Sequence, residues 1–169
     1  MLLRSMKLGR VSPAAFLNQS DEQFWVRRAR REVGQAEIPG QVSNPKIDEY
    51  AACTSLKATS DEIPWCSSFM CWVFEKENIP SPRSAAASSW LRWGVAIDKP
   101  AAGCVVIFKR RGGHHVGLYV GENAGFYEIL GGNQSNRVCV QSYPKALALA
   151  FRMPFPEYYQ SSESQQDLS

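Results

Sequence analysis

Apolar side chains recur at helical spacing through the first half of the chain. In the first such stretch, Ser20 and Gln23 have the spacing of a capping box, and Gly34 supplies a stop. Asn44 and Pro45 then provide an N-cap and a first-turn proline for the next stretch. The pattern predicts four helices, over residues 20–34, 45–56, 64–78 and 84–93.

The character of the chain changes after Gly103, where short runs of strand-forming residues alternate with glycine-rich or charged turns. These runs predict strands over residues 105–108, 116–120, 126–130, 138–142 and 149–153. Helices first and strands afterwards predict an α+β fold. In such a fold the N-terminal helices pack on one face of a C-terminal antiparallel β-sheet.

A length of 169 residues suits one domain with a single core. We expect an N-terminal extension over residues 1–19, a folded domain over residues 20–156 and a tail over residues 157–169. The end of the chain is rich in serine, glutamine and acidic residues without any apolar pattern, so we expect the tail to be disordered.

Composition and charge narrow the classes of function. Hydrophobic residues make up 44% of the chain and charged residues 21%, which is typical of a soluble globular protein. A net charge of +3 is too small to indicate a nucleic-acid-binding protein. No apolar stretch approaches the length of a membrane span, and Arg4, Lys7 and Arg10 interrupt the segment where a signal peptide needs an apolar core. We therefore expect neither membrane insertion nor an export signal.

The five cysteines are an odd number, and they include no Cys-x-x-Cys pair of the kind that builds a zinc or redox site. The two histidines are adjacent, which is not the spacing of metal ligands either. We therefore expect reduced thiols, no metal and no other cofactor.

Cys66 has a setting that the other cysteines lack. Pro64 marks the start of a predicted helix, so Cys66 falls in the first turn, where unpaired backbone amides and the helix dipole lower the pKa of a thiol. Cys66 is thus a candidate nucleophile, with a buried structural thiol as the alternative. The other four cysteines lie in helical or strand patterns, which are ordinary places for buried thiols.

His114 and His115 stand at the head of a predicted strand. Side chains alternate along a strand, so one of the two can face the helix that carries Cys66 while the other faces solvent. An imidazole facing that helix is the general base that a thiol nucleophile requires.

A catalytic imidazole also needs a third group that fixes its tautomer. Asn133, at the end of the next predicted strand, is the candidate for an arrangement of Cys, His and Asn. Gln134 and Glu128 are alternatives, and Gly-Gly-Asn is also common turn chemistry.

Four motifs stand in order along the chain: residues 61–69 (DEIPWCSSF), 103–108 (GCVVIF), 115–121 (HVGLYVG) and 130–134 (LGGNQ). Together they resemble the CHAP and NlpC-type cysteine hydrolases of bacterial cell walls, in particular the compact phage and bacterial members. The upstream helix and its Glu-Ile-Pro-Gly turn are similar to the lead-in segment of that subgroup, so the resemblance covers residues 21–154.

The resemblance implies a papain-like fold in which residues 20–156 form the catalytic domain. It implies that Cys66 attacks an amide carbonyl, that His115 is the base because it directly precedes Val-Gly, and that Asn133 is the third polar residue. Members of the family cleave peptide bonds of the peptidoglycan stem peptide or the amide that joins this peptide to the sugar.

The chain departs from the family pattern at two positions. Cys104 stands where the family usually has aspartate before the hydrophobic strand, and Gly131 stands where many CHAP members carry glutamate. The second departure removes one member of a four-residue catalytic set and leaves Asn133 as the expected partner of the histidine.

Candidate substrate-binding residues flank these positions; they are Trp65, Ser67, Trp90, His114 and Gln134. Trp93, Phe126 and Tyr127 are further candidates for the walls of a groove, although aromatic side chains at such spacing also serve as core. The basic run 109–111 is either a contact for carboxylates of an acidic stem peptide or a solvated turn.

The expected partner is bacterial peptidoglycan, and the expected role is that of a lysis enzyme or an antibacterial effector. An effector would also have a cognate immunity protein. The expected route begins with synthesis in the cytoplasm and ends at the cell wall after release or secretion. Two other functions fit the same residues: an inert cell-wall or protein-binding module, and an acyltransferase that uses the same thiol.

Overall fold

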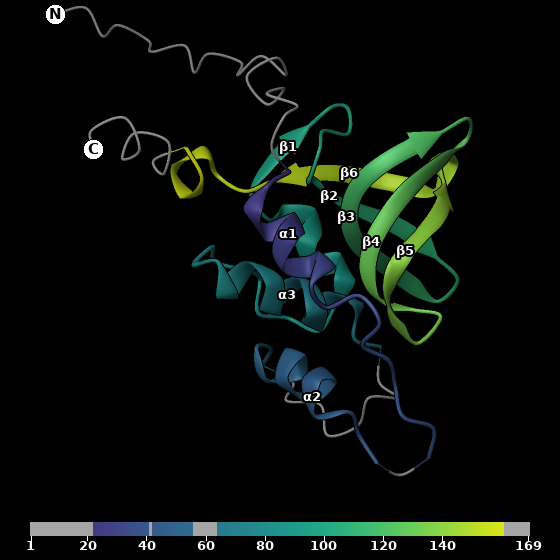
Figure 1. Cartoon of the computed structure of the whole chain (residues 1–169). Helices are drawn as coiled ribbons and strands as arrows, with labels where there is room; N and C mark the ends of the chain where they lie inside the picture. Colours follow the sequence, from purple (N-terminus) through teal and green to yellow (C-terminus); the bar gives the residue numbers. More distant parts are fainter. Residues whose placement is uncertain (1–21, 41, 56–63, 161–169) are drawn as a thin grey trace, which may run out of the picture.

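The computed structural model describes residues 22–40, 42–55 and 64–160. Helices come first and strands afterwards (Figure 1), so the α+β prediction is confirmed. The helices are α1 (Phe24–Arg30), α2 (Pro45–Ala52) and α3 (Cys66–Lys76), with 3-10 turns η2 (Ala87–Arg92), η3 (Lys145–Leu147) and η4 (Pro156–Tyr158). The strands are β1 (Val95–Ile97), β2 (Val105–Arg110), β3 (Gly113–Asn123), β4 (Phe126–Gln134), β5 (Arg137–Pro144) and β6 (Ala148–Met153).

The strands form one six-stranded sheet in the order β1-β6-β2-β3-β4-β5, and every neighbouring pair is antiparallel. The sheet is strongly curved (Figure 1). Although β2 and β5 are not neighbours, the rings of Phe108 and Tyr143 stack with 4.9 Å between their centroids. This curvature brings the end of β5 over the β2-β3 hairpin, where the histidines lie.

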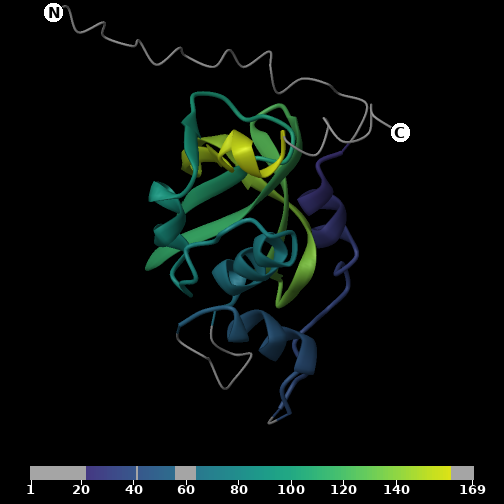
Figure 2. The same ribbon diagram turned by 90° about the vertical axis from the view of Figure 1, so that its left-hand side faces the viewer.

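Helix α3 is the centre of the core. Each of its residues from Cys66 to Phe74 is buried, including Ser67 and Ser68. Its neighbours are α2 on one side and strands β3 and β4 on the other. Figure 2 shows the same arrangement from a second direction, with α3 between α2 and the sheet. The N-terminus of α3 is thereby held against the middle of the sheet.

The helix boundaries differ from the sequence prediction where local signals were ambiguous. Helix α1 ends at Arg30 rather than at Gly34, and Val33, which lies in the last turn of the predicted helix 20–34, is 50% exposed. Ser20 and Leu56, which marked two predicted helix ends, lie outside the described residues, as do the extension 1–19 and most of the predicted tail. The start of α2 is confirmed, because Asn44 Oδ1 accepts a hydrogen bond from the Lys46 amide at 2.9 Å and Pro45 opens the helix.

The predicted helix 64–78 begins two residues later than expected, with Trp65 as N-cap and Cys66 as the first helical residue. The predicted helix 84–93 is the short 3-10 turn η2. Strand β1 was not predicted, because two half-buried residues around an exposed one carry no pattern of their own. The strand exists through its pairing with β6, as in Val95 opposite Met153.

Each of the five cysteines lies within the described residues and carries a free thiol. Of the helices in the described part of the chain, none combines the length and apolar character needed to cross a bilayer.

Candidate active site

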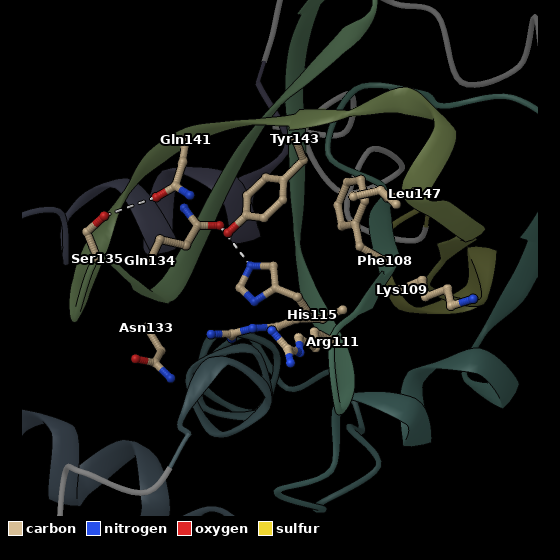
Figure 3. A pocket seen from close by; sticks show the side chains of 11 residues that line it. Phe108, Lys109, Arg111, His115, Asn133, Gln134, Ser135, Gln141, Tyr143 and Leu147 are labelled. Carbon is tan, nitrogen blue, oxygen red and sulfur yellow. Dashed lines mark hydrogen bonds between the residues drawn. The ribbon is translucent and has the colours of Figure 1, made fainter.

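A cleft of 520 Å³ opens where the β2-β3 hairpin, the β4-β5 turn and the end of β5 meet (Figure 3). His115, Asn133, Gln134 and Tyr143 line it, together with the basic residues at the end of β2. These side chains come from three separate stretches of the chain, the β2-β3 hairpin, the β4-β5 turn and the end of β5, so the cleft exists only because the sheet curves.

Cys66 lies beside this cleft as the first residue of α3, and its side chain is almost fully buried. The backbone groups of Val116, in the facing strand β3, and of Ser67, in the same turn, lie close enough to the thiol to lower its pKa. Val116 directly follows His115 in that strand. The helix start and the strand therefore bring the thiol to the position in the sheet that carries the histidine.

Burial dominates the electrostatics of the thiol. It raises the pKa of Cys66 above its ordinary value, and the backbone groups of Val116, Ser67 and Cys66 itself, together with the Arg110 charge, offset only part of that effect. The backbone of the helix start does act to lower the pKa of Cys66, as predicted, but the prediction of a net lowering is wrong. Desolvation of a nearly closed site outweighs the amides of one helical turn, so the resting group is a neutral thiol.

His115 is buried and has one side-chain partner. Its Nε2 lies 3.0 Å from Oε1 of Gln134. The Gln134 amide nitrogen donates to the carbonyl oxygens of Ile129 at 3.1 Å and Cys139 at 2.6 Å, which fixes the orientation of that amide. Its oxygen must then accept from His115, so the ring proton lies on Nε2.

The other ring nitrogen of His115, Nδ1, is buried and has no hydrogen-bond partner in the described part of the chain. With the proton held on Nε2, the lone pair of Nδ1 is free to accept a proton. Burial lowers the pKa of His115 to about 4, with the Arg110 charge acting in the same direction and the Gln134 hydrogen bond acting against it. The imidazole is thus a neutral base at neutral pH.

The ring of Tyr143 stacks on the imidazole of His115. The two rings are parallel within 16° at a centroid distance of 4.9 Å, and the Tyr143 ring stacks in turn on Phe108. Sequence reasoning missed this residue, because the predicted strand ended at residue 142 and the contact depends on curvature. In the structure half-buried and exposed residues alternate along the second half of β5, and Tyr143 lies on the half-buried side.

Three glycines make room for this arrangement. A Cβ on Gly131 would lie 2.7 Å from Oε1 of Gln134, and a Cβ on Gly117 would collide with Ile129. A Cβ on Gly132 would lie 2.7 Å from side-chain atoms of both Trp65 and Phe69, which flank Cys66. Gly131 therefore leaves space for the glutamine on the histidine, and Gly132 lets β4 approach the start of α3.

Asn133, the predicted partner of the histidine, does not contact it within the described structure. It sits in the left-handed region with a φ of 53°, and its amide points away from His115 (Figure 3). Gln134, which sequence reasoning kept as an alternative and also as a substrate-binding residue, takes that place instead. The reason is the tight β4-β5 turn, which directs one side chain outward and the next one back under the sheet.

The remaining predicted substrate-binding residues lie mainly in the core. Trp65 is buried and donates from Nε1 to Glu37 Oε1 at 2.8 Å. Trp90 is fully buried, and its Nε1 donates at 2.9 Å to Oγ of Ser67, which is buried as well. His114 is half-buried, lies opposite Lys109 in the β2-β3 ladder and does not line the cleft.

The further aromatic candidates do not line the cleft either. Trp93 lies beside a separate small pocket, and Phe126 and Tyr127 lie at the far end of the β3-β4 hairpin. Across the described residues, no group of three or more His, Cys, Asp or Glu side chains is placed to hold a metal ion. The site thus combines a neutral thiol, a neutral base and an amide that fixes the tautomer of that base, which is the equipment for nucleophilic attack on a carbonyl.

A model of the NlpC/P60 family matches residues 56–152, which is more than half of the chain and includes Cys66, His115 and Gln134. No curated protein matches the chain.

Proposed function

Because the chain belongs to the NlpC/P60 family, a group of papain-like cysteine hydrolases of the cell wall, we propose that it hydrolyses an amide bond of bacterial peptidoglycan with Cys66 as nucleophile, His115 as base and Gln134 as positioning residue. The bond is either in the stem peptide or between the stem peptide and the sugar. The observation that carries the proposal is the fixed tautomer of His115. Gln134 keeps the ring proton on Nε2, which leaves the lone pair of Nδ1 free, and the next residue of the same strand, Val116, lies near the Cys66 thiol.

The chemistry follows from these protonation states. Nδ1 of His115 accepts the proton of the Cys66 thiol as Sγ bonds to the carbonyl carbon of the substrate. Unpaired amides in the first turn of α3 stabilise the oxyanion. The same imidazole then donates the proton to the leaving nitrogen, which gives a thioester and a free amine. Water, deprotonated by His115, hydrolyses the thioester and restores the thiol.

Gln134 takes the role that the sequence assigned to Asn133. When His115 accepts the proton on Nδ1, the imidazolium keeps its Nε2 hydrogen bond to Oε1, so the glutamine supports both states of the ring. Because Gln134 is anchored by two backbone carbonyls, it does not rotate to follow the substrate.

Mass analysis of purified peptidoglycan after digestion tests the proposal. The wild type should release fragments with a new amine and a new carboxyl terminus, and Cys66→Ala should release none. Cys53→Ala, which removes a half-buried thiol at the end of α2, is the matched control and should cleave like the wild type. Identical fragments from the wild type and Cys66→Ala would sink the proposal.

The same digestion separates the two other functions considered above. An acyltransferase would yield a fragment that carries an added amine in place of the new carboxyl group. If the protein is an inert binding module, the wild type should release no fragments, and Cys66→Ala should still bind the wall.

We further propose that the enzyme reaches the wall by release or secretion, as a lysis enzyme or an effector. An effector should copurify with an immunity protein when the two are expressed together.

A further inference from the structure

Arg110 is the last residue of β2 and lies on the same face of the sheet as His115. In the β2-β3 ladder Phe108 lies opposite His115, and Lys109 lies opposite His114. Because side chains alternate along a strand, Arg110 shares the face of Phe108, and Lys109 belongs to the other face. Figure 3 agrees, since the Lys109 ammonium points away from His115.

The guanidinium of Arg110 has no acidic partner among the described residues. Two other arginines of the described chain form ion pairs, Arg28 with Glu77 at 2.5 Å and Arg30 with Glu22 at 2.6 Å. The described residues that line the cleft include three basic side chains and no acidic one. A permanent positive charge therefore stands at the cleft with nothing in the described protein to neutralise it.

The charge acts on the reacting groups themselves. Arg110 contributes to lowering the pKa of Cys66, of His115 and of Tyr143, so its guanidinium lies within electrostatic range of all three. The side chain is exposed, so solvent reduces this influence. It remains free to reach a ligand that enters the cleft.

A guanidinium recognises a carboxylate with two parallel hydrogen bonds, and the geometry of this planar pair discriminates against neutral groups. The other polar groups of the cleft include the amides of Asn133 and Gln141 and the hydroxyl of Ser135, which bind neutral peptide groups equally well. Arg110 is thus a group on the histidine's face that can distinguish an acidic substrate from its neutral counterpart.

We propose that Arg110 binds a free carboxylate of the substrate next to the scissile amide, so that the enzyme selects acidic peptides over the same peptides with that carboxylate amidated. This inference rests on the proposed function, because it concerns the substrate of the Cys66 and His115 site. It assigns the basic end of β2 to substrate recognition rather than to a solvated turn.

Two peptides test the inference, identical except for a carboxylate or a carboxamide beside the scissile bond. The wild type should cleave the carboxylate peptide with a kcat/KM at least about tenfold higher, as expected for one charge-assisted pair. Arg110→Gln should remove this preference by slowing cleavage of the carboxylate peptide alone, and Arg110→Lys should restore part of it. Arg31→Gln, the same substitution on an exposed residue at the end of α1, should keep the full preference.

Equal loss for both peptides in Arg110→Gln would mean that Arg110 acts only through the thiol and the imidazole, and would overturn the inference. The absence of a preference in the wild type would overturn it as well. If the wild type cleaves neither peptide, the proposed function fails, and calorimetric binding of the same two peptides to Cys66→Ala decides the inference separately. Tighter binding of the carboxylate peptide that is lost on adding Arg110→Gln supports it, and equal or absent binding contradicts it.

Discussion

Replacing Gly131 by alanine should damage the site while leaving the fold nearly intact. The added Cβ would lie 2.7 Å from Oε1 of Gln134, whereas ordinary contact begins at 3.4 Å. The nearest backbone atom to the new Cβ, the Val116 oxygen, is at a comfortable 3.5 Å, so the glutamine end is the group that must move. A retreat by the missing distance lengthens the 3.0 Å contact with His115 to about 3.7 Å, which is no longer a hydrogen bond.

The expected magnitudes separate activity from stability. Leaving the buried Nε2 proton of His115 without an acceptor costs about 1 to 3 kcal/mol. The alanine recovers about 0.4 to 1 kcal/mol by restricting the unfolded chain, so the net loss of stability is about 1 kcal/mol. Activity depends on the tautomer that the same bond fixes, and its loss should reduce kcat/KM by about 100-fold.

The assay compares kcat/KM for fragment release from peptidoglycan with the free energy of unfolding in urea. Gly121→Ala is the matched control, because its Cβ meets only Glu128 Cβ, at 3.9 Å, and it should behave as the wild type in both measurements. Gly117→Ala, whose Cβ collides with Ile129 in the core, should lose stability first. A folded Gly131→Ala variant with wild-type kcat/KM would refute the role given to Gln134.

Three further outcomes follow from the same site. Because burial lowers the pKa of His115 to about 4, the imidazole stays a neutral base as the pH falls, and kcat/KM should decline only as the pH approaches 4; an acidic limb near the ordinary value of 6.5 contradicts this. In the unfolded chain His115 binds a proton below about pH 6.5, whereas in the folded chain it does so only near pH 4. The free energy of unfolding of the wild type should therefore fall by about 3 kcal/mol between pH 6.5 and pH 4, compared with that of His115→Gln, as measured by urea titrations at these two pH values. Tyr143→Leu should lower kcat/KM about threefold to tenfold by removing the ring stacked on His115, and Tyr143→Phe should not; equal losses would assign the effect to the hydroxyl instead.

The sequence carries the parts of the fold that depend on local pattern. The order of helices and strands, the start of α2 at Asn44-Pro45 and the placement of Cys66 at a helix start all follow from neighbouring residues. Strand β1 and the stacking of Tyr143 on His115 depend instead on pairing with β6 and on the curvature of the sheet. Contacts of this kind join segments that are distant in sequence, so the spacing of neighbouring residues does not predict them.

The third member of the site shows the same limit at finer scale. Asn133 and Gln134 are neighbours with the same functional group, and a pattern cannot tell which of two adjacent amides turns inward. The structure decides, because the turn places Asn133 at a φ of 53° and the missing Cβ of Gly131 leaves room for Gln134. The pKa of Cys66 was misjudged for a related reason, since the extent of burial is a property of the assembled layers.

The division of the site between two layers makes activity a reporter of assembly. The thiol belongs to the helical half, which ends before β1. The imidazole, Gln134 and the six strands found in the described residues belong to the half that follows Gly94. Neither half contains both the proposed nucleophile and the proposed base. A chain cut between Gly94 and Val95 would therefore regain activity only when its two fragments reassociate. The rate of cleavage would then be proportional to the number of correctly reassembled molecules.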